Sequence, residues 1–172
     1  MKSCAQLCVP VGQLPENGLT VTVDVAFAAL DIEDTERIAC PERLQVQLHI
    51  ARVGHEILAR GELHSTLVCH CDRCLETYRH PVATADVCHL VEEPADLTID
   101  LTEAIREDIL LVFPEQCLCR PECRGLCPHC GQNLNAGQCA CATRETRRDA
   151  WGVLDHLHLQ IPPEDELKQD NG

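Results

Sequence analysis

Cysteine is the residue type in this chain that could carry chemistry, and most of it comes in close pairs. The sequence has 14 cysteines among 172 residues. The four close pairs are Cys71 and Cys74, Cys119 and Cys123, Cys127 and Cys130, and Cys139 and Cys141. Zn²⁺ takes four thiolates tetrahedrally, and two tight turns that supply two ligands each make such a site. The pairs therefore predict two four-cysteine zinc sites. Their role would be structural, because four protein ligands leave no position for an activated water.

The most specific segment is the turn Cys127-Pro-His-Cys130-Gly131. Pro128 fixes the entry of the turn, and Gly131 lets the backbone approach the second sulfur, as in a zinc knuckle. A further cysteine pair follows after eight intervening residues. We expect His129, inside the turn, to face solvent.

The four pairs can be combined into two sites in three ways. Loop closure favours a site made of Cys127, Cys130, Cys139 and Cys141, because the loop between these pairs is short. The remaining Cys71, Cys74, Cys119 and Cys123 would then fasten a strand hairpin to a later segment. The spacing alone leaves the other two combinations open.

The other six cysteines have weaker signals. Cys4 and Cys8 are spaced as a pair near the N-terminus, whereas Cys40, Cys69, Cys88 and Cys117 are most simply small buried hydrophobic residues. Cys69 and Cys117 each lie two residues before a proposed ligand and could compete for a metal.

Two other kinds of chemistry fit part of the pattern. Cys71-Asp-Arg-Cys74 has the spacing of a dithiol redox motif, and Arg73 could lower a thiol pKa. Such motifs usually begin a helix, whereas this one follows a strand-like run. An iron–sulfur cluster is also open by ligand count. The sequence has no Walker loop, GxGxxG, HExxH or GxSxG motif, so we do not expect an enzyme with a small-molecule substrate.

The residues before the cysteine-rich segment read mainly as strands. Apolar and polar residues alternate over 19–27 and over 44–50, which is typical of antiparallel strands with one solvated face. Gly54 marks a turn into a third strand, 56–68, and a fourth run, 77–91, contains Pro81, which suggests a sheet edge or a bend. The acidic stretch 31–42 is expected to be a loop or a short helical turn.

One helix is predicted over 99–113, where Leu101, Ile105, Ile109 and Val112 form an apolar stripe and Pro114 ends it. Thr98 or Asp100 could cap it. We expect an α+β protein: mainly an antiparallel β-sheet or partly open barrel with one packed helix. The predicted domains are a β domain (1–116), a cysteine-rich zinc module (117–142), a C-terminal helix (143–159) and a disordered tail (160–172).

Composition excludes several functions. Only four residues are aromatic, which argues against a base-stacking platform for single-stranded nucleic acid. No apolar run approaches the length of a bilayer helix, and the N-terminus lacks a signal-peptide core, so we expect a cytoplasmic protein without membrane contact. The net charge of −14 suits a protein that meets basic partners.

The motifs resemble the YceD family, the large ribosomal RNA subunit accumulation proteins. The resemblance covers about 70 to 141 and is carried by Cys71-Asp-Arg-Cys74-Leu-Glu76, by Ile99-Asp-Leu101 through Ile105 to Pro114, and by Leu118-Cys119, Cys123 to Gly131, Asn133-Leu-Asn135 and Cys139-Ala-Cys141. It selects Cys71 over Cys69 and Cys119 over Cys117 as ligands. It implies a role in accumulation of large-subunit ribosomal RNA, without a known catalytic activity.

The charge distribution suggests how such a protein could meet its partners. Residues 117–150 carry a net charge of +2 and the rest of the chain −16. The basic residues of this segment, which could contact ribosomal RNA, are Arg120, Arg124, Arg144, Arg147 and Arg148. Alternatively, they offset the charge of two zinc–thiolate centres. Genes of the family often lie beside a gene for a small large-subunit ribosomal protein, so a basic ribosomal protein is a second candidate partner for the acidic strand domain.

Overall fold

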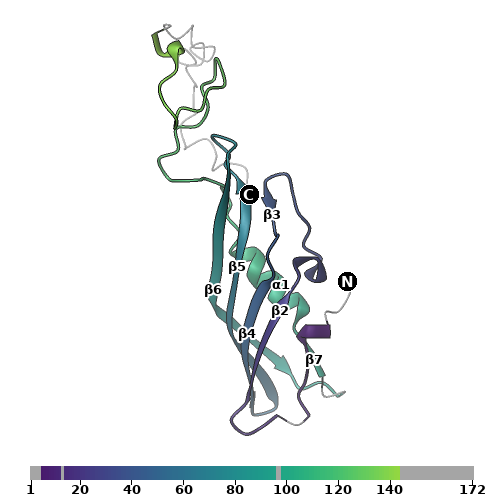
Figure 1. Ribbon diagram of the computed structural model, residues 1–172. Helices are drawn as coiled ribbons and strands as arrows, with labels where there is room; N and C mark the ends of the chain where they lie inside the picture. The colour runs from purple at the N-terminus through teal and green to yellow at the C-terminus, as the bar shows by residue number, and fades with distance from the viewer. Residues whose placement is uncertain (1–4, 13, 96–97, 144–172) are drawn as a thin grey trace, which may run out of the picture.

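The fold is built on one antiparallel sheet of five strands. The computed structural model describes residues 5–12, 14–95 and 98–143. The strands are β2 (Leu19–Val25), β3 (Ile38–Ala39), β4 (Leu44–Val53), β5 (Glu56–His70) and β6 (Thr77–Glu92). Strand β4 lies between β2 and β5, and β6 pairs along the other edge of β5. The short β3 pairs with the C-terminal end of β5. The described part of the sheet does not close into a barrel, so of the two predicted forms the open sheet is the one observed (Figure 1).

The alternating pattern of the sequence gives the sheet one buried and one open face. On β4, Leu44, Val46, Leu48 and Ile50 are buried, while Gln45, Gln47 and His49 between them are exposed. In the antiparallel register Val23 lies opposite Val46, so apolar residues from neighbouring strands meet on the same face. The predicted period of two is therefore confirmed for these strands.

Helix α1 (Thr102–Leu111) packs against the buried face, and Ile105 and Ile109 are fully buried there. It is shorter than predicted at both ends. Thr98–Asp100 forms strand β7, which pairs with β1 (Cys8–Pro10). The Asp100 carboxylate accepts the backbone N–H of Thr102 at 2.9 Å, so it satisfies a donor of the first helical turn. His89 of β6 and Asp108 of α1 lie 2.7 Å apart and join the helix to the sheet.

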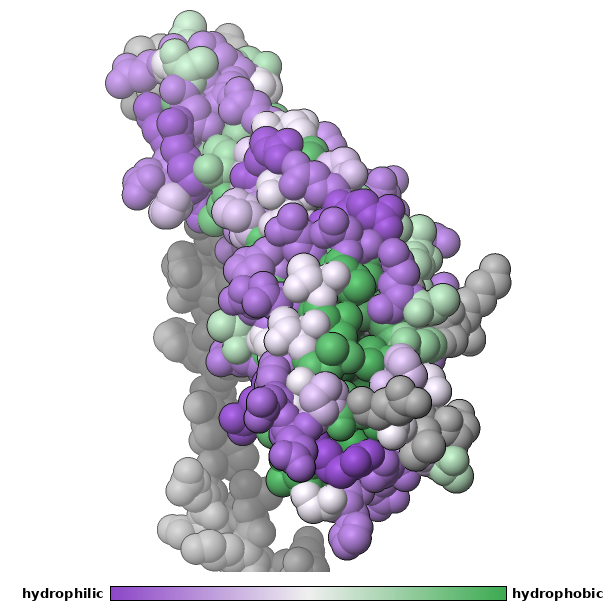
Figure 2. Space-filling model, turned by 60° about the horizontal axis from the view of Figure 1, so that its bottom comes forward, coloured by the Kyte–Doolittle hydropathy of each residue, from purple (hydrophilic) through white to green (hydrophobic). Residues whose placement is uncertain are grey.

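The acidic stretch 31–42, expected to be a loop or a short helical turn, contains one short strand and is preceded by a short helix. Strand β2 ends at Val25, and Phe27–Leu30 forms a 3-10 helix, η2, whose Phe27 packs against Phe113 with ring centroids 6.2 Å apart. Strand β3 then adds two residues to the edge of β5. Figure 2 shows the resulting surface: apolar side chains form one central band surrounded by hydrophilic residues.

The longest elements are β5 and β6, and their turn carries the first cysteine pair. The hairpin points upward in Figure 1, and the green cysteine-rich segment that follows α1 lies above its turn. Within 117–143 the only helix or strand is the short 3-10 helix η3 (Ala140–Thr143). A 3-10 helix η1 (Ala5–Leu7) precedes β1. The predicted C-terminal helix and tail lie outside the described residues. In the described part of the chain, no helix has the length and apolarity to cross a membrane.

Candidate metal centres

Two groups of four cysteines come together in space. We call Cys71, Cys74, Cys119 and Cys123 the hairpin site, and Cys127, Cys130, Cys139 and Cys141 the ribbon site. Within each site the four sulfurs lie within 4.8 Å of one another. The structure therefore groups the pairs in the way that loop closure favours.

The hairpin site has the dimensions of a mononuclear metal centre. Cys71 Sγ lies 3.7 Å from Cys123 Sγ, and Cys74 Sγ lies 3.7 Å from Cys119 Sγ. A tetrahedron with Zn–S bonds of about 2.3 Å has edges of about 3.8 Å. Cys71, Cys74 and Cys123 are buried, and none of the eight thiols is in a disulfide. The donor set and its spacing thus fit one tetrahedral thiophilic ion.

The turn between β5 and β6 positions the first pair. Cys71 N–H donates to Glu76 O, and Leu75 N–H donates to Cys71 O, both at 2.9 Å. Leu75 closes the turn with φ of +61°, in the left-handed region that non-glycine residues rarely adopt. Both sulfurs consequently face the incoming segment rather than the end of a helix.

Asp72 binds the segment that begins at Cys117 and so holds it against the turn between β5 and β6. Its backbone N–H donates to Cys117 O at 2.7 Å, and its carboxylate accepts the Cys117 N–H at 2.8 Å. Arg37 makes a two-pronged ion pair with the same carboxylate at 3.0 and 2.8 Å. The Cys117 N–H and the Arg37 guanidinium together hold the pKa of Asp72 below its usual value, even though partial burial opposes this. These contacts among Arg37, Asp72 and Cys117, which we call the clamp, position the following Cys119 and Cys123 beside the hairpin turn.

The guanidinium of Arg73, which could have lowered a thiol pKa, instead binds a backbone carbonyl group. Its guanidinium donates to Cys123 O at 3.0 Å, and its own carbonyl accepts the N–H of Leu126 at 3.0 Å. Gly125 passes so close that a Cβ there would lie 2.9 Å from Arg73 O. These contacts join the hairpin turn to the chain that enters the ribbon site.

Local N–H groups and burial set unequal proton affinities within the hairpin site. Burial would raise the pKa of Cys71, but backbone N–H groups of Cys119, Cys74 and Arg73 outweigh it and lower the pKa to about 6. Burial raises the pKa of Cys74 to about 12. A metal that binds here would therefore displace at least one proton.

The ribbon site is built on a tight turn. Cys127 N–H donates to Gln132 O at 2.8 Å, and Gly131, at φ of +73°, donates to Cys127 O at 2.9 Å. The backbone N–H groups of His129 and Cys130 lower the pKa of Cys127 to about 6, and the neighbouring Cys130 thiol raises that of Cys141 to about 12. The side chain of His129 is exposed.

The other cysteines divide differently from the prediction. Cys69 and Cys117 are buried in the main core and Cys40 is half-buried. Cys88 is exposed, so its expected burial is wrong: it lies on the open face of β6, where alternation places every second side chain in solvent. Cys8 is half-buried in β1, and Cys4 lies outside the described residues.

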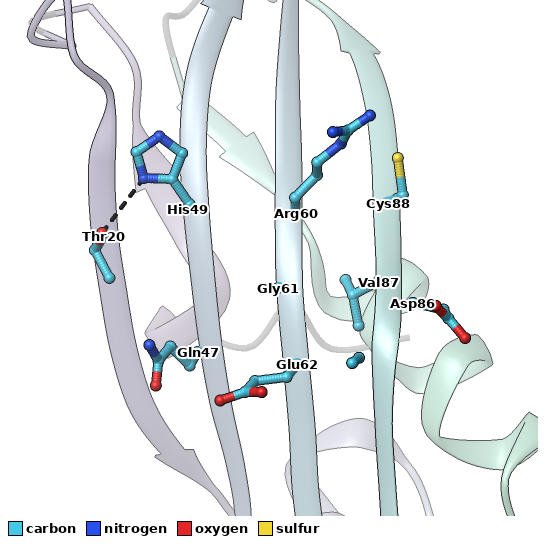
Figure 3. A pocket seen from close by; sticks show the side chains of 10 residues that line it. Thr20, Gln47, His49, Arg60, Gly61, Glu62, Asp86, Val87 and Cys88 are labelled. Carbon is cyan, nitrogen blue, oxygen red and sulfur yellow. Dashed lines mark hydrogen bonds between the residues drawn. The ribbon is translucent and has the colours of Figure 1, made fainter.

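A second concave site lies on the open face of the sheet, with a volume of about 630 Å³ (Figure 3). Its lining includes His49, Arg60, Glu62, Asp86 and Cys88. It lies at a bulge, where Glu62 of β5 faces two residues of β6 as the register shifts after Gly61. The side chains drawn in Figure 3 are spread over four strands and stand apart from one another, except Thr20 Oγ1 and His49 Nδ1 at 3.3 Å. The arrangement offers no closely assembled set of groups for catalysis.

The fold and the two clusters define the class: an antiparallel sheet protein with one packed helix and two four-cysteine clusters that could hold metal ions. Residues 86–158 match the family model of the large ribosomal RNA subunit accumulation protein YceD. Residues 86–158 are thus similar to the YceD family, which confirms the resemblance of the motifs in this part of the chain.

Curated relatives agree with this relationship over part of their length. An uncharacterized protein of Mycobacterium tuberculosis is 31% identical over 106 residues, an alignment that covers 53% of this chain and 51% of the relative. The chloroplastic large ribosomal RNA subunit accumulation protein YCED homolog 1 of Arabidopsis thaliana is 33% identical over 70 residues, which covers 41% of this chain and 22% of the relative. The homolog 1 of Zea mays is 41% identical over 54 residues, covering 31% and 18%. The chain therefore spans about half the length or less of these relatives. No solved structure matches it.

Sequence reasoning missed the residues that support the sulfurs. The clamp of Arg37 and Asp72 joins positions 35 residues apart, and no spacing pattern announces such a pair. Arg120 and Arg124 are exposed on the cysteine-rich segment. Arg144, Arg147 and Arg148 lie outside the described residues.

Proposed function

We propose that this protein is a non-enzymatic, cytoplasmic factor that supports accumulation of large-subunit ribosomal RNA during ribosome biogenesis. The observation that carries the proposal is the YceD match over residues 86–158, a segment that contains six of the eight clustered cysteines. The relatives in Arabidopsis and Zea mays are named for ribosomal RNA accumulation.

We further propose that each four-cysteine site holds one zinc ion with a structural role. The 3.7 Å sulfur separations agree with the edge of a zinc tetrathiolate. An iron–sulfur cluster would need room for several iron and sulfide atoms among its ligands, whereas sulfurs within 4.8 Å of one another suit a single ion. Zinc would fasten residues 117–142 to the sheet of residues 1–116 as a separate module.

The partner of the module would be ribosomal RNA or a basic large-subunit ribosomal protein. Exposed Arg120 and Arg124, with Arg144, Arg147 and Arg148 further along the chain, supply positive charge for phosphate. The acidic remainder, at −16, suits a basic protein surface.

The test is complementation of cells that lack the gene, with large-subunit ribosomal RNA measured relative to small-subunit RNA. The wild-type chain should restore the ratio and the Cys71→Ser/Cys74→Ser variant should not. Purification of the tagged protein would identify bound RNA and protein. If it brings down neither ribosomal RNA nor ribosomal proteins and the ratio is unaffected, the chain is an adaptor in another process.

Direct RNA contact has its own test. Replacing Arg144, Arg147 and Arg148 by alanine together should reduce crosslinking to RNA, and adding Arg120→Ala and Arg124→Ala should reduce it further. Unchanged crosslinking in both variants would show that the arginines serve only to offset the metal–thiolate charge.

A thiol redox protein is the second candidate, favoured by the lowered pKa of Cys71. That function requires a metal-free protein with one rapidly alkylated cysteine. Zinc-loaded protein with unreactive thiols would exclude it, and this is the outcome that the burial of Cys71 and Cys74 leads us to expect.

A further inference from the structure

The hairpin site and the ribbon site are neighbours along the chain, and the backbone around Leu126 lies between them. Leu126, directly before the first ribbon ligand, donates its N–H to Arg73 O in the hairpin turn at 3.0 Å. Its side chain packs against the cluster of buried Cys71, Cys74 and Cys123. One segment thus borders both sites.

The side chain of Asn135, which follows the first cysteine pair of the ribbon site, contacts residues of the hairpin site. Its Nδ2 lies 3.2 Å from the Cys123 sulfur of the hairpin site, and its Oδ1 accepts the backbone N–H of Arg124 at 2.9 Å. A backbone N–H can only donate, so the atom that faces Arg124 must be the amide oxygen. The orientation of the amide is thereby set, with its NH₂ group toward the sulfur.

Asn135 itself lies in the segment between the two cysteine pairs of the ribbon site. It follows the chain reversal that begins at the Cys127 turn and precedes the ligand Cys139. Its N–H donates to Asn133 Oδ1 at 2.9 Å, Asn133 bridges to Leu126, and Leu134 donates to Gly125 O at 2.9 Å. The amide that supports the hairpin site is therefore positioned by the chain segment that connects the two cysteine pairs of the ribbon site.

We propose that Asn135 couples the two metal sites, so that an ion in the ribbon site strengthens binding of an ion in the hairpin site. The inference rests on the metal binding of the proposed function. Once Cys123 is a metal-bound thiolate, the Nδ2–H group donates to it, and removal of such outer donors typically lowers metal affinity 10- to 100-fold. An ion in the ribbon site orders the loop that places this donor. Since linkage is reciprocal, the hairpin ion strengthens the ribbon ion by the same factor.

The test is a titration with Co²⁺ against a competing chelator, read from thiolate-to-cobalt absorption. Three proteins are needed: the wild-type chain, a hairpin-only variant (Cys127→Ser/Cys130→Ser) and a ribbon-only variant (Cys71→Ser/Cys74→Ser). Each is also made with Asn135→Asp, which keeps the oxygen that accepts the Arg124 N–H and removes the donor. Gln138→Ala, at an exposed position of the same loop, is the matched control.

The readout is the product of the two association constants in the wild-type chain, divided by the product of the constants of the two single-site variants. We expect this ratio to be about tenfold or more, to be retained in Gln138→Ala, and to fall to about one with Asn135→Asp. In the hairpin-only variant, Asn135→Asp should change the Co²⁺ affinity little, because a ribbon site without an ion does not hold the Asn135 amide in place.

A ratio of one in the wild-type chain, or a ratio that survives Asn135→Asp, would overturn the coupling while leaving both metal sites intact. Failure of the wild-type chain to bind any Co²⁺ would instead contradict the proposed metal sites. Circular dichroism of each variant shows whether the sheet is folded, so loss of binding through unfolding is recognised.

Discussion

Asp72 joins the cysteine-rich segment to the hairpin through both its backbone and its side chain. Its carboxylate receives both Arg37 and the Cys117 N–H, and its own N–H reaches Cys117 O. A charged acceptor in a two-pronged pair is a strong hydrogen-bonding group. None of the three contacts involves a metal ligand, so the clamp and the metal are separate contributions to the same junction.

Replacement of Asp72 by asparagine should lower the melting temperature at pH 7, because one amide oxygen replaces two charged acceptor oxygens. The pKa of Asp72 lies below its ordinary value, so its contribution is present above about pH 4 and is lost as the pH falls further. The difference between wild type and variant should thus be constant from pH 8 to 5 and shrink below about pH 4. Asp86→Asn, on the exposed bulge, is the control. An equal melting temperature for Asp72→Asn would contradict the clamp.

At this scale, residue type and spacing indicated the eight clustered cysteines. Loop closure favoured their observed grouping without excluding the other two combinations, because only the ligands of the ribbon site lie close along the chain. The supporting residues could not be predicted. Asn135 and Asp72 act through hydrogen bonds to positions that only the folded chain brings near. Cys88 shows the opposite failure: a cysteine in an apolar strand was expected to be buried, but its place in the alternation puts it on the open face.

Among the elements, the contact between β4 and β5 allows no side chain at its closest point. A Cβ at Gly61 would lie 1.9 Å from Gln47 O of the neighbouring strand. The register shift between β5 and β6 starts at the same residue. Glycine is thus needed at position 61, where β5 approaches β4 closely and the bulge between β5 and β6 begins.

We expect Gly61→Ala to destabilise the protein by about 3 kcal/mol, since backbone must move to admit the methyl group. Gly137→Ala is the matched control, because a Cβ there meets nothing within 4 Å. Urea unfolding of both variants measures the difference. If Gly61→Ala is as stable as Gly137→Ala, the close approach of the strands is wrong.

The long strands and the helix were predictable because their patterns repeat over many residues. Strands β1 and β7 were not, because each has three residues and exists through pairing with a segment about 90 positions away. Ile99 was therefore included in the helix, although it is buried as the partner of Val9 in this small sheet. The bulge was equally invisible, since it is a property of two strands together.

On the scale of the whole molecule, two apolar clusters have different sources of stability. The larger contains the inner residues of the sheet and helix α1, and it is independent of the clustered cysteines. The smaller is centred on Cys71, Cys74 and Cys123. Within 117–143 almost every buried residue is a cysteine, so this segment has little core of its own.

Removal of metal with a strong chelator should therefore unfold the cysteine-rich segment and leave the sheet. Hydrogen exchange should become fast over residues 117–143 and at the hairpin tip, while β4 and the lower parts of β5 and β6 remain protected. Mass spectrometry of peptides from treated and untreated protein measures this. Loss of protection over the whole sheet would show that the metal sites hold the entire fold.

The central claim, that the eight cysteines form two separate four-thiolate zinc centres, is tested most directly by native mass spectrometry with elemental analysis of protein purified without added metal. The account predicts two zinc ions for the wild-type chain, and one for each of the variants Cys71→Ser/Cys74→Ser and Cys127→Ser/Cys130→Ser. Cys69→Ser, a buried cysteine outside both clusters, should retain two. Wild-type protein that carries no zinc, or that holds iron and sulfide in its place, would contradict the account.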